Sequence, residues 1–465
     1  MTAPDTPRSW LARSGPLVGL VVMAALVRAL TLAWAPPIAL TGDELYYSQV
    51  AANLALGEGH VFREAWPGGS NLHAWRPPGH AALLAAVLSP DDARALDGSV
   101  QSAMDGIVLQ IVFGSLLAGA ACALGGALID RRTGVAAGLG VALYPSLVVF
   151  SHGLWSETLA ALLLTTALAI AVVAREARSP AAAIAVGAVL GAATLVREIS
   201  LLVALACATW WVLEATGPAR RRAIGHAALM LAILGACVAP WTLRNTELFG
   251  RLVPVSTIGW FATAEGNLFE ADDWLRDTGP EHLAFNQRYF SQPGELERSD
   301  LAREQALSSI AGQQPGWIAK KWIRNGALLL SPDSYLLFKQ AVGAYGDVTP
   351  AVRTASLWLV ALSWGAAAAL GAFGLSIAAP HARRLALLVL ATPATVHLVS
   401  NATSRFRIPW IALWLVFAAL GARELPSARQ HWQAIPRWRR SALVAFLGFV
   451  FLVAFPYYAE YGGRR

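Results

Sequence analysis

The chain has 465 residues, of which 56% are hydrophobic and only 14% are charged, and its formal net charge is +7 at pH 7. Soluble globular proteins carry roughly 25% charged residues, so this composition excludes a disordered chain and argues against a soluble enzyme. The apolar residues come in long runs, which is typical of a polytopic membrane protein. Basic loops that face the cytoplasm explain the positive charge without a nucleic-acid partner.

Apolar runs of membrane-spanning character recur along the whole chain. A transmembrane helix needs about 17–25 mostly apolar residues. The runs that approach this length are Pro16–Pro37, Ala103–Ile129, Gly134–Phe150, Leu154–Ala174, Ala181–Leu195, Ile199–Leu213, Ala223–Leu243, Val352–Ile377, Leu385–Val399, Phe406–Leu420 and Ala442–Phe455. The first run is too long for the apolar part of a signal peptide, so we expect it to be retained. The sequence predicts an all-α membrane protein of about eleven transmembrane helices.

Clusters of arginine fall in every second predicted loop. They are Arg8 and Arg13, Arg131 and Arg132, Arg175 and Arg178, Arg220–Arg222, Arg383 and Arg384, and the group from Arg423 to Arg440. The positive-inside rule places these loops in the cytoplasm. The other side then holds two long polar segments, residues 38–102 and 246–351. The alanine-rich composition is typical of bacteria, so we expect a bacterial inner-membrane protein whose active site faces the periplasm or the cell exterior.

The two outer segments suggest a division into three regions. Amphipathic stretches at Glu44–Leu56 and Gly79–Leu88 predict interfacial helices in the first outer loop. Helix-like stretches at His282–Tyr289 and Ser299–Gln313 predict a small helical cap in the second. We therefore expect an N-terminal transmembrane module (1–245, with the loop 38–102), an extracytoplasmic cap (246–351) and C-terminal transmembrane helices (352–465).

Two adjacent carboxylates, Asp43 and Glu44, stand directly after the first span in the sequence Thr-Gly-Asp-Glu-Leu-Tyr-Tyr. Negative charge is favoured at a helix N-terminus, so Asp43 could simply cap the helix that follows. A carboxylate here could equally act as a general base on an acceptor hydroxyl while a sugar leaves a phosphate. The spacing alone does not choose between these interpretations.

The next polar motif is His73-Ala74-Trp75-Arg76-Pro77-Pro78. The two prolines end one backbone segment and open the next helix, which leaves Arg76 at the turn. A guanidinium held at the depth of the membrane surface suits a phosphate group. The alternative is an interfacial anchor, with Trp75 and Arg76 reaching to the lipid headgroups.

Two outer turns then carry further polar residues. Ser151-His152-Gly153-Leu154-Trp155-Ser156-Glu157 places Glu157 just inside an apolar helix, where a charge is costly unless it faces a polar cavity. The turn that follows contains Arg197 and Glu198, which could neutralise each other. His152 has no second histidine at metal-ligand spacing and could be an ordinary interfacial residue.

The last two motifs also lie at the outer face. Arg244 and Asn245 follow Pro240-Trp241 at the end of the seventh span, and Arg405 and Arg407 stand in Ser-Arg-Phe-Arg-Ile-Pro at the start of the tenth. Each alone is an ordinary interfacial residue. Taken together, the charged residues of these motifs, which stand in or beside apolar spans, gather on one side of the membrane. This argues against an active site on the cytoplasmic side.

This set of motifs resembles the GT-C superfamily of membrane glycosyltransferases. The sequence is similar to the bacterial protein O-mannosyltransferase-like and aminoarabinose-transferase-like enzymes of glycosyltransferase family 39. Gly-Asp-Glu-x-x-Tyr at residues 42–47 and Arg-Pro-Pro at 76–78 carry the resemblance, with Tyr144-Pro145-Ser146 and the motifs around Glu157, Arg244 and Arg405 in the same order. The likeness extends through Pro409. Position 46 is tyrosine where the aminoarabinose transferases tend to have a basic residue, which weakens the case for that substrate.

The resemblance implies an inverting transferase that moves one sugar from a polyprenyl-phosphate donor to a lipid, polysaccharide or protein acceptor of the cell envelope. It implies Asp43 as the catalytic carboxylate and Glu44 as its orienting or acceptor-binding neighbour. We expect Tyr47, Arg76, Arg244 and Arg405 to bind the lipid phosphate. We expect the sugar and acceptor pocket to be lined by His73, His152, Glu157, Arg197, Asn245 and Arg407.

Arginines can neutralise a single phosphate leaving group without a metal ion. The sequence demands no cofactor, although Asp43 and Glu44 could share a divalent cation. Relatives carry a larger soluble domain after the last span, so we expect acceptor recognition to rest on the two outer segments.

Two other functions fit parts of the pattern. A transporter or flippase for a lipid-linked sugar would need polar residues through the depth of the membrane, whereas here they gather at the outer edge. A ligase that moves a polymer from a polyprenyl diphosphate could have a similar arginine-rich outer site. The Asp-Glu pair after the first span favours the single-sugar transferase.

Overall fold

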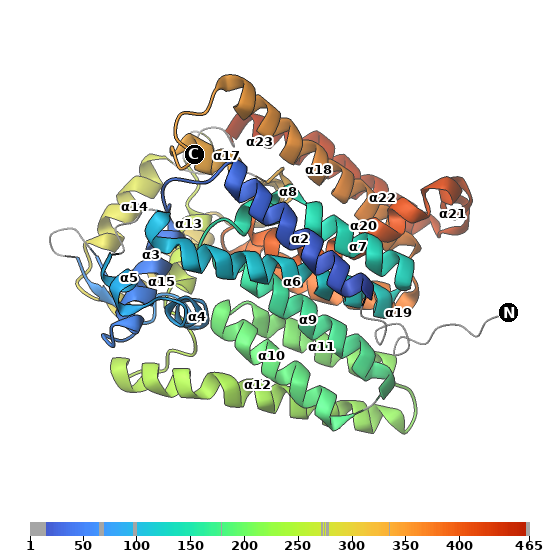
Figure 1. The fold of residues 1–465 in the computed structure, drawn as a ribbon, viewed down its shortest axis with the longest axis horizontal. Coiled ribbons are helices and arrows are strands. Elements are labelled where there is room, and N and C mark those ends of the chain that lie inside the picture. The colour runs from blue at the N-terminus through green and yellow to red at the C-terminus, as the bar shows by residue number, and fades with distance from the viewer. Residues whose placement is uncertain are drawn as a thin grey trace.

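The chain, described here from a computed structural model, is a bundle of roughly aligned helices with smaller helices gathered at one end (Figure 1). The structure describes residues 15–64, 69–95, 100–177, 179–270, 273, 275, 279–333 and 335–461. Within these ranges the only strands are β1 (Phe62–Arg63) and β2 (Asn71–Leu72), which pair antiparallel. The predicted all-α class is confirmed. Arg8, Arg13 and Arg178, used above to predict the orientation, lie outside the described residues.

Eight helices in the described ranges are long and apolar enough to cross a membrane. They are α2 (Gly15–Trp34), α6 (Met104–Leu128) with η1 (Gln101–Ala103) before it, α9 (Ser156–Ala177), α12 (Ala219–Phe249), α18 (Pro350–Ile377), α19 (Pro380–Val399), η2 (Ser404–Trp410) continued by α20 (Ile411–Arg423), and α22 (Arg437–Phe449) continued by η4 (Val450–Ala454) and α23 (Phe455–Tyr461). Two more predicted spans are the shorter apolar helices α10 (Pro180–Val196) and α11 (Ser200–Glu214). The chain is a multi-pass membrane protein.

The remaining predicted span, residues 134–150, is interrupted. It forms α7 (Arg131–Leu143) and α8 (Pro145–Phe150), which are separated at Tyr144. Tyr144 has φ −66° and ψ 117°, an extended conformation, because a residue that precedes proline is pushed out of the helical region. Pro145 then begins α8 in its first turn, where its missing N–H costs nothing.

Small residues allow the membrane helices to pack closely, as in other helical membrane proteins. The clearest case is the contact between α18 and α20. A Cβ atom added at Gly374 would lie well under 3.0 Å from the backbone carbonyl of Phe417, and one at Gly421 would meet the carbonyl of Leu370 in the same way. Only glycine at these positions lets the two backbones touch.

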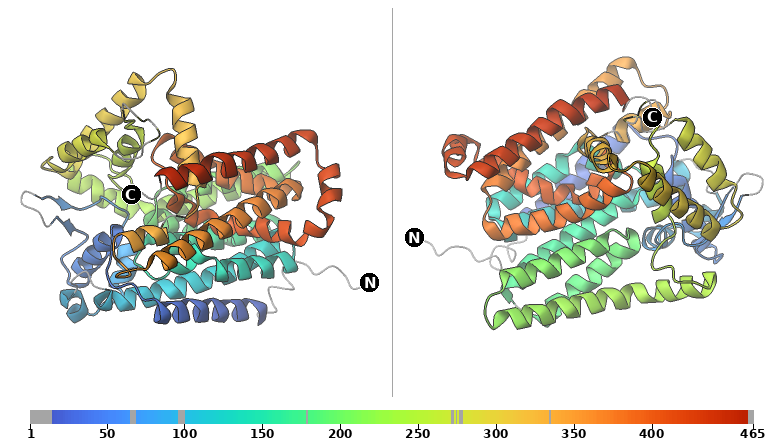
Figure 2. Two further views of the ribbon diagram at one scale, coloured as in Figure 1. Left: turned by 90° about the horizontal axis from the view of Figure 1, so that it is seen from above. Right: turned by 180° about the vertical axis from the view of Figure 1, so that it is seen from behind.

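The smaller helices form two groups at the same end of the bundle (Figure 2). The first outer loop contains α3 (Asp43–Ala55), α4 (Gly79–Ala85) and α5 (Pro90–Ala95). The second, called the cap here, contains α13 (Gly259–Asn267), α14 (Pro280–Phe290), α15 (Glu295–Gly312), α16 (Trp317–Leu330) and α17 (Tyr335–Ala341). The interfacial and cap helices predicted from the sequence are confirmed. At the opposite end lie η3 (Leu425–Ser427) and α21 (Ala428–Ala434) (Figure 1).

Replacing Gly374 with alanine should force α18 and α20 apart. Overpacking of this kind costs roughly 1–3 kcal/mol, so Gly374→Ala should lower the midpoint of thermal unfolding of the purified protein in detergent. The matched control is Gly235→Ala in α12, where an added methyl group meets nothing within 4 Å. Equal unfolding midpoints for the two variants would contradict the close packing described here.

Candidate active site

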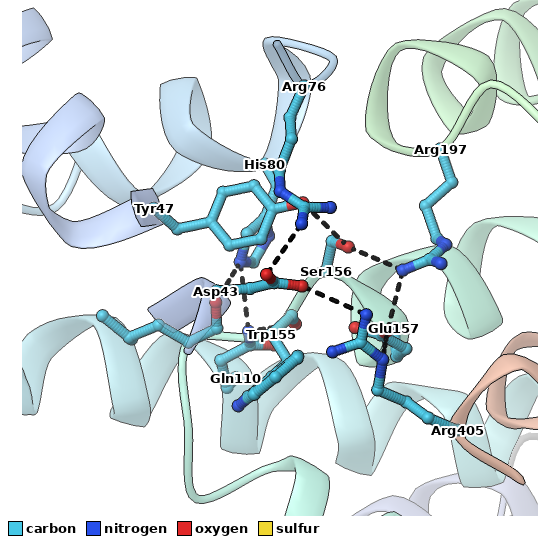
Figure 3. A network of polar contacts seen from close by, with 11 residues as sticks. Asp43, Tyr47, Arg76, His80, Gln110, Trp155, Ser156, Glu157, Arg197 and Arg405 are labelled. Carbon is cyan, nitrogen blue, oxygen red and sulfur yellow. Dashed lines mark hydrogen bonds and ion pairs between the residues drawn. The ribbon is translucent and has the colours of Figure 1, made fainter. Parts of the chain in front are cut away.

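The site begins at Asp43, the first residue of α3. The residue before it, Gly42, has φ 54°, a left-handed conformation that glycine adopts without strain. The helix cap is Gly42, with no side-chain cap hydrogen bond, so Asp43 is not the N-cap. Its carboxylate instead lies between two arginines (Figure 3): Oδ1 is 2.7 Å from Nη2 of Arg76, and Oδ2 is 3.1 Å from Nη2 of Arg405.

A second carboxylate continues the arrangement on the other side of Arg405. Oε1 of Glu157 lies 3.1 Å from Nε of Arg405 and 2.8 Å from Nη1 of Arg197. Arg197 also donates to Oγ of Ser156, which accepts a second hydrogen bond from the hydroxyl of Tyr47, both at 3.2 Å. Figure 3 shows these side chains converging from separate segments.

The charges alternate along this chain, in the order Arg76, Asp43, Arg405, Glu157, Arg197. Three guanidinium groups face two carboxylates, so the set carries one net positive charge and suits an anionic ligand. Burial raises the pKa of the Asp43 carboxyl, but the guanidinium groups of Arg76, Arg405 and Arg197 outweigh it, and the pKa lies below its usual value. Asp43 is therefore ionised at neutral pH.

Next to this charge chain lies a cavity of about 800 Å³. Its walls include Asp43, Tyr47, Arg76, Arg197 and Arg405, and residues of the cap and of α19 complete it. A cavity of this size, with a few convergent polar groups, is typical of a small-molecule site. Four residues that were predicted to be catalytic or to bind the phosphate therefore line one cavity: Asp43, Tyr47, Arg76 and Arg405. Arg197, which was predicted to line the sugar pocket, lines the same cavity.

Glu44, the neighbour of Asp43, faces a different environment. Its buried carboxylate pairs with Nζ of Lys339 at 2.9 Å and accepts hydrogen bonds from Thr41 and from the backbone N–H of Leu154. Glu44 thereby ties the start of α3 to α17 and to the segment before α9. Glu44 does not line the cavity, so a catalytic role for it rests on the sequence alone.

His152 and Arg407 also lie away from the cavity. A ring nitrogen of His152 is 2.9 Å from the backbone oxygen of Arg28, and burial lowers the pKa of His152 to about 4, so the ring is neutral. Arg407 donates to the backbone oxygens of Leu329 and Ser331, the latter at 2.7 Å. Both residues contact the backbone of neighbouring segments in this arrangement.

Arg244, Asn245 and His73 form a cluster beside the cavity. Nη1 of Arg244 donates to the backbone oxygen of His73 and to Oδ1 of Asn245, each at 3.0 Å. None of the three lines the cavity. Arg244 therefore supports the loop that leads to Arg76, and its contact with a phosphate stays a prediction.

A buried carboxylate that the sequence analysis did not single out holds the same loop from the cap. Glu295, at the start of α15, accepts hydrogen bonds from the backbone N–H groups of His73 and Ala74 at 2.7 and 3.1 Å and from Thr257 at 2.6 Å. Burial raises the pKa of Glu295 above its usual value. These contacts place the loop residue Arg76 against Asp43.

Lys339 and Ser156 were also missed as site residues. Lys339 lies in the apolar stretch Tyr-Leu-Leu-Phe-Lys-Gln, and a lone charge in such a stretch signals a buried partner. Its partner, Glu44, is 295 residues away, so no local pattern identifies the pair.

The carboxylates do not form a metal site in this arrangement. The Asp43 carboxylate pairs with two arginines, and the Glu44 carboxylate pairs with Lys339. The two carboxylates therefore face different cations. Among the described residues no three His, Cys, Asp or Glu side chains gather as a ligand set. The residues therefore do not fit a divalent ion shared by Asp43 and Glu44.

The fold is similar to that of known glycosyltransferases. A structure of the oligosaccharyltransferase from Archaeoglobus fulgidus with Zn and sulfate matches with a TM-score of 0.53 and 15% identity, over 95% of this chain and 52% of that one. Its complex (as AglB) with an inhibitory peptide and a dolichol-phosphate gives 0.53 and 14%, over 96% and 55%. ArnT from Cupriavidus metallidurans bound to undecaprenyl phosphate gives 0.42 and 15%, over 91% and 81%.

The chain spans about half the length of the oligosaccharyltransferase chains that it matches. No family model matches the sequence, and no curated protein matches it. At 14–15% identity the likeness shows the fold alone, which the chain shares with these structures of the archaeal oligosaccharyltransferase.

Breaking the buried pair of Glu44 and Lys339 should destabilise the protein strongly. Lys339→Met leaves Glu44 charged and unpaired, which costs roughly 3–5 kcal/mol. Thermal unfolding in detergent measures this loss, and Glu44→Gln combined with Lys339→Met should recover much of it. The control is Arg251→Met, because Arg251 pairs with Asp300 on the exposed surface, where such pairs contribute about 0–1 kcal/mol. If Lys339→Met is no less stable than the control, the pair of Glu44 and Lys339 does not stabilise the fold.

Proposed function

We propose that the protein is an inverting glycosyltransferase that moves a single sugar from a polyprenyl-phosphate donor to a cell-envelope acceptor. The reaction takes place at the extracytoplasmic face of a bacterial inner membrane. The observation that carries the proposal is the position of the Asp43 carboxylate between Arg76 and Arg405 on the wall of a polar cavity at the end of a transmembrane bundle. The related fold of an oligosaccharyltransferase, one structure of which holds a dolichol-phosphate, supports a lipid-phosphate ligand.

The proposed chemistry is a single displacement at the anomeric carbon. The acceptor hydroxyl oxygen forms a bond to the anomeric carbon, and the bond between that carbon and the phosphate oxygen breaks. Asp43 takes the hydroxyl proton. The donor phosphate is a diester with one negative charge, and the departing polyprenyl phosphate gains a second. Arg76, Arg405 and Arg197 therefore stabilise the transition state more than the bound donor, which is the requirement for catalysis.

The ion pairs of Asp43 also give the donor a role in activating the base. In the free protein Asp43 is a weak base, because its guanidinium partners lower its pKa. A phosphate that takes over hydrogen bonds from Arg76 and Arg405 releases the carboxylate and raises its pKa. The base then becomes effective when the donor is in place.

Glu157 has a positioning role in this scheme. Its one oxygen holds both Arg197 and Arg405, so it sets the spacing of two of the three cations that face the phosphate. Its side chain is about 1% exposed and is not among the residues that line the cavity. This differs from the sugar-pocket role predicted from the sequence.

Asp43→Asn should separate donor binding from transfer. The asparagine does not compete with the phosphate for Arg76 and Arg405, so the variant should bind undecaprenyl phosphate in nanodiscs at least as tightly as the wild type. Transfer should fall by about 10²–10⁴-fold, the usual contribution of a general base. Transfer is measured by mass spectrometry of envelope glycolipids, glycans and glycoproteins from a deletion strain that expresses each variant.

Arg76→Gln is the contrasting variant. It removes a charged donor to the phosphate, so undecaprenyl phosphate should bind about tenfold or more weakly. Arg251→Gln, on the exposed surface of the cap, serves as the control that changes neither property. Wild-type levels of product from Asp43→Asn would overturn the proposed role of Asp43.

The donor class can be tested separately. A ligase that uses a polyprenyl diphosphate would bind undecaprenyl diphosphate more tightly than the monophosphate. We expect the reverse, because each of the three arginines is already paired with a carboxylate, so the site offers no cluster of unpaired cations. A clear preference for the diphosphate would favour the ligase.

A further inference from the structure

The segment that joins α20 to α22, at the end of the bundle opposite the cap, is strongly basic (Figure 1). Residues 423–440, called the basic segment here, contain one acidic residue, Glu424. Their arginines are Arg423, Arg429, Arg437, Arg439 and Arg440. The helices on both sides of the segment are membrane spans, so its η3 and α21 lie at the membrane surface on that face.

The carboxylates that contact the basic segment pair with Arg423 and His431. Glu424 lies 2.9 Å from Nη2 of Arg423 and 3.1 Å from Nε2 of His431. Asp130, which caps α7, pairs with Arg423 as well. In the part of the chain that the structure describes, the other four arginines of the segment have no carboxylate partner: Arg429, Arg437, Arg439 and Arg440.

A further cation meets the basic segment at the end of α18. Nη1 of Arg439 donates to the backbone oxygen of Ser376 at 3.3 Å, and Nη1 of Arg383, from α19, donates to that of Ala378 at 2.8 Å. A positive charge is favourable at a helix C-terminus. The two guanidinium groups nevertheless repel each other, and no carboxylate of the described residues pairs with either. An anion bound beside them would relieve this repulsion.

Two exposed tryptophans stand among these arginines. Trp432 is 39% exposed and Trp438 is 65% exposed. The guanidinium of Arg440 lies 5.9 Å from the ring centre of Trp432, and that of Arg439 lies 5.3 Å from the ring centre of Trp438. Tryptophan is enriched where lipid headgroups meet the acyl chains, and its ring attracts a cation. The basic segment therefore combines positive charge with apolar rings, which is typical of a surface that binds anionic lipid.

The positive-inside rule accounts for arginines at this face, but it depends only on their charge. The cluster Arg220–Arg222 shows the difference. It lies at the same end of the bundle, because α12 begins there and ends beside the cavity. Among the described residues, none of these three arginines lies over an aromatic ring. The rule therefore does not explain the tryptophans of the basic segment or the cations that meet at α18.

We propose that the basic segment binds the phosphate groups of anionic phospholipids in the membrane leaflet opposite the cap. The exposed Arg429 and Arg437 and the arginines beside the tryptophans contact the headgroups, while the indole rings lie against the acyl chains. A lipid is favoured over an acidic protein because the cations lie between two spans, at the level of the lipid phosphates. This inference concerns a surface remote from the cavity and does not depend on the proposed function.

Two triple variants with the same change of charge test the proposal. The first replaces Arg429, Arg437 and Arg440 with glutamine. The matched control replaces all three residues of the cluster Arg220–Arg222 with glutamine. A third variant replaces Arg429, Arg437 and Arg440 with lysine, which keeps the charge. Protein amount in the membrane and thermal unfolding in detergent show that all variants fold.

Binding of phosphatidylglycerol and of phosphatidylcholine with the same acyl chains is measured by native mass spectrometry of the purified protein in detergent. The wild type should bind phosphatidylglycerol about tenfold or more tightly, because only this lipid has a net negative charge. The glutamine variant of the basic segment should lose the preference to within about twofold. The lysine variant and the control at the start of α12 should keep it. Raising the salt concentration should weaken it.

Four outcomes would overturn the inference. The wild type shows no preference for phosphatidylglycerol, or the glutamine variant of the basic segment keeps the preference. The control at the start of α12 loses the preference equally, which would show a response to net charge alone. In the fourth outcome, the wild type binds polyglutamate, an acidic peptide without acyl chains, and does not distinguish the two lipids; the partner is then a protein.

Discussion

Five charged side chains in alternating order organise the functional end of this protein. Asp43 comes from α3, Arg76 from the first outer loop, Arg405 from η2, Glu157 from α9 and Arg197 from the turn after α10. A charge removed from water at the end of a membrane bundle is costly unless it is paired. Each member of this set is paired with a residue from another segment, so the full set forms only when five separate segments meet.

That requirement explains the contacts around the set. The loop that leads to Arg76 is held by Glu295 from the cap and by Arg244 from α12. The ion pair of Glu44 and Lys339 holds the start of α3 against α17. These residues do not touch the cavity, but they decide whether the guanidinium groups stand within reach of one ligand. The same end of the bundle also has the helical cap, which supplies further walls of the cavity.

The proposed reaction also depends on the surrounding membrane. A lipid-linked donor has its reactive phosphate at the membrane surface and its hydrocarbon chain in the bilayer, so its site needs a polar cavity joined to an apolar groove. Two apolar grooves are lined in part by α19, and Val396 and His397 near the end of that helix each line one groove and the polar cavity. The bundle therefore joins the polar cavity to apolar surface, as a lipid-linked donor would require.

The sequence alone determined the membrane class, most of the spans and the end of the bundle where the polar motifs gather. These properties depend on local hydropathy and on the order of charged loops. It also identified Asp43, Arg76, Arg405, Glu157 and Arg197 as candidates, because they stand at one face of the membrane in motifs that resemble those of known glycosyltransferases. Adjacent residues show where this reasoning stopped: Asp43 lines the cavity, whereas Glu44 is buried against Lys339. Only the tertiary structure decided which oxygen meets which cation, because those contacts join segments as far apart as 295 residues and leave no local pattern.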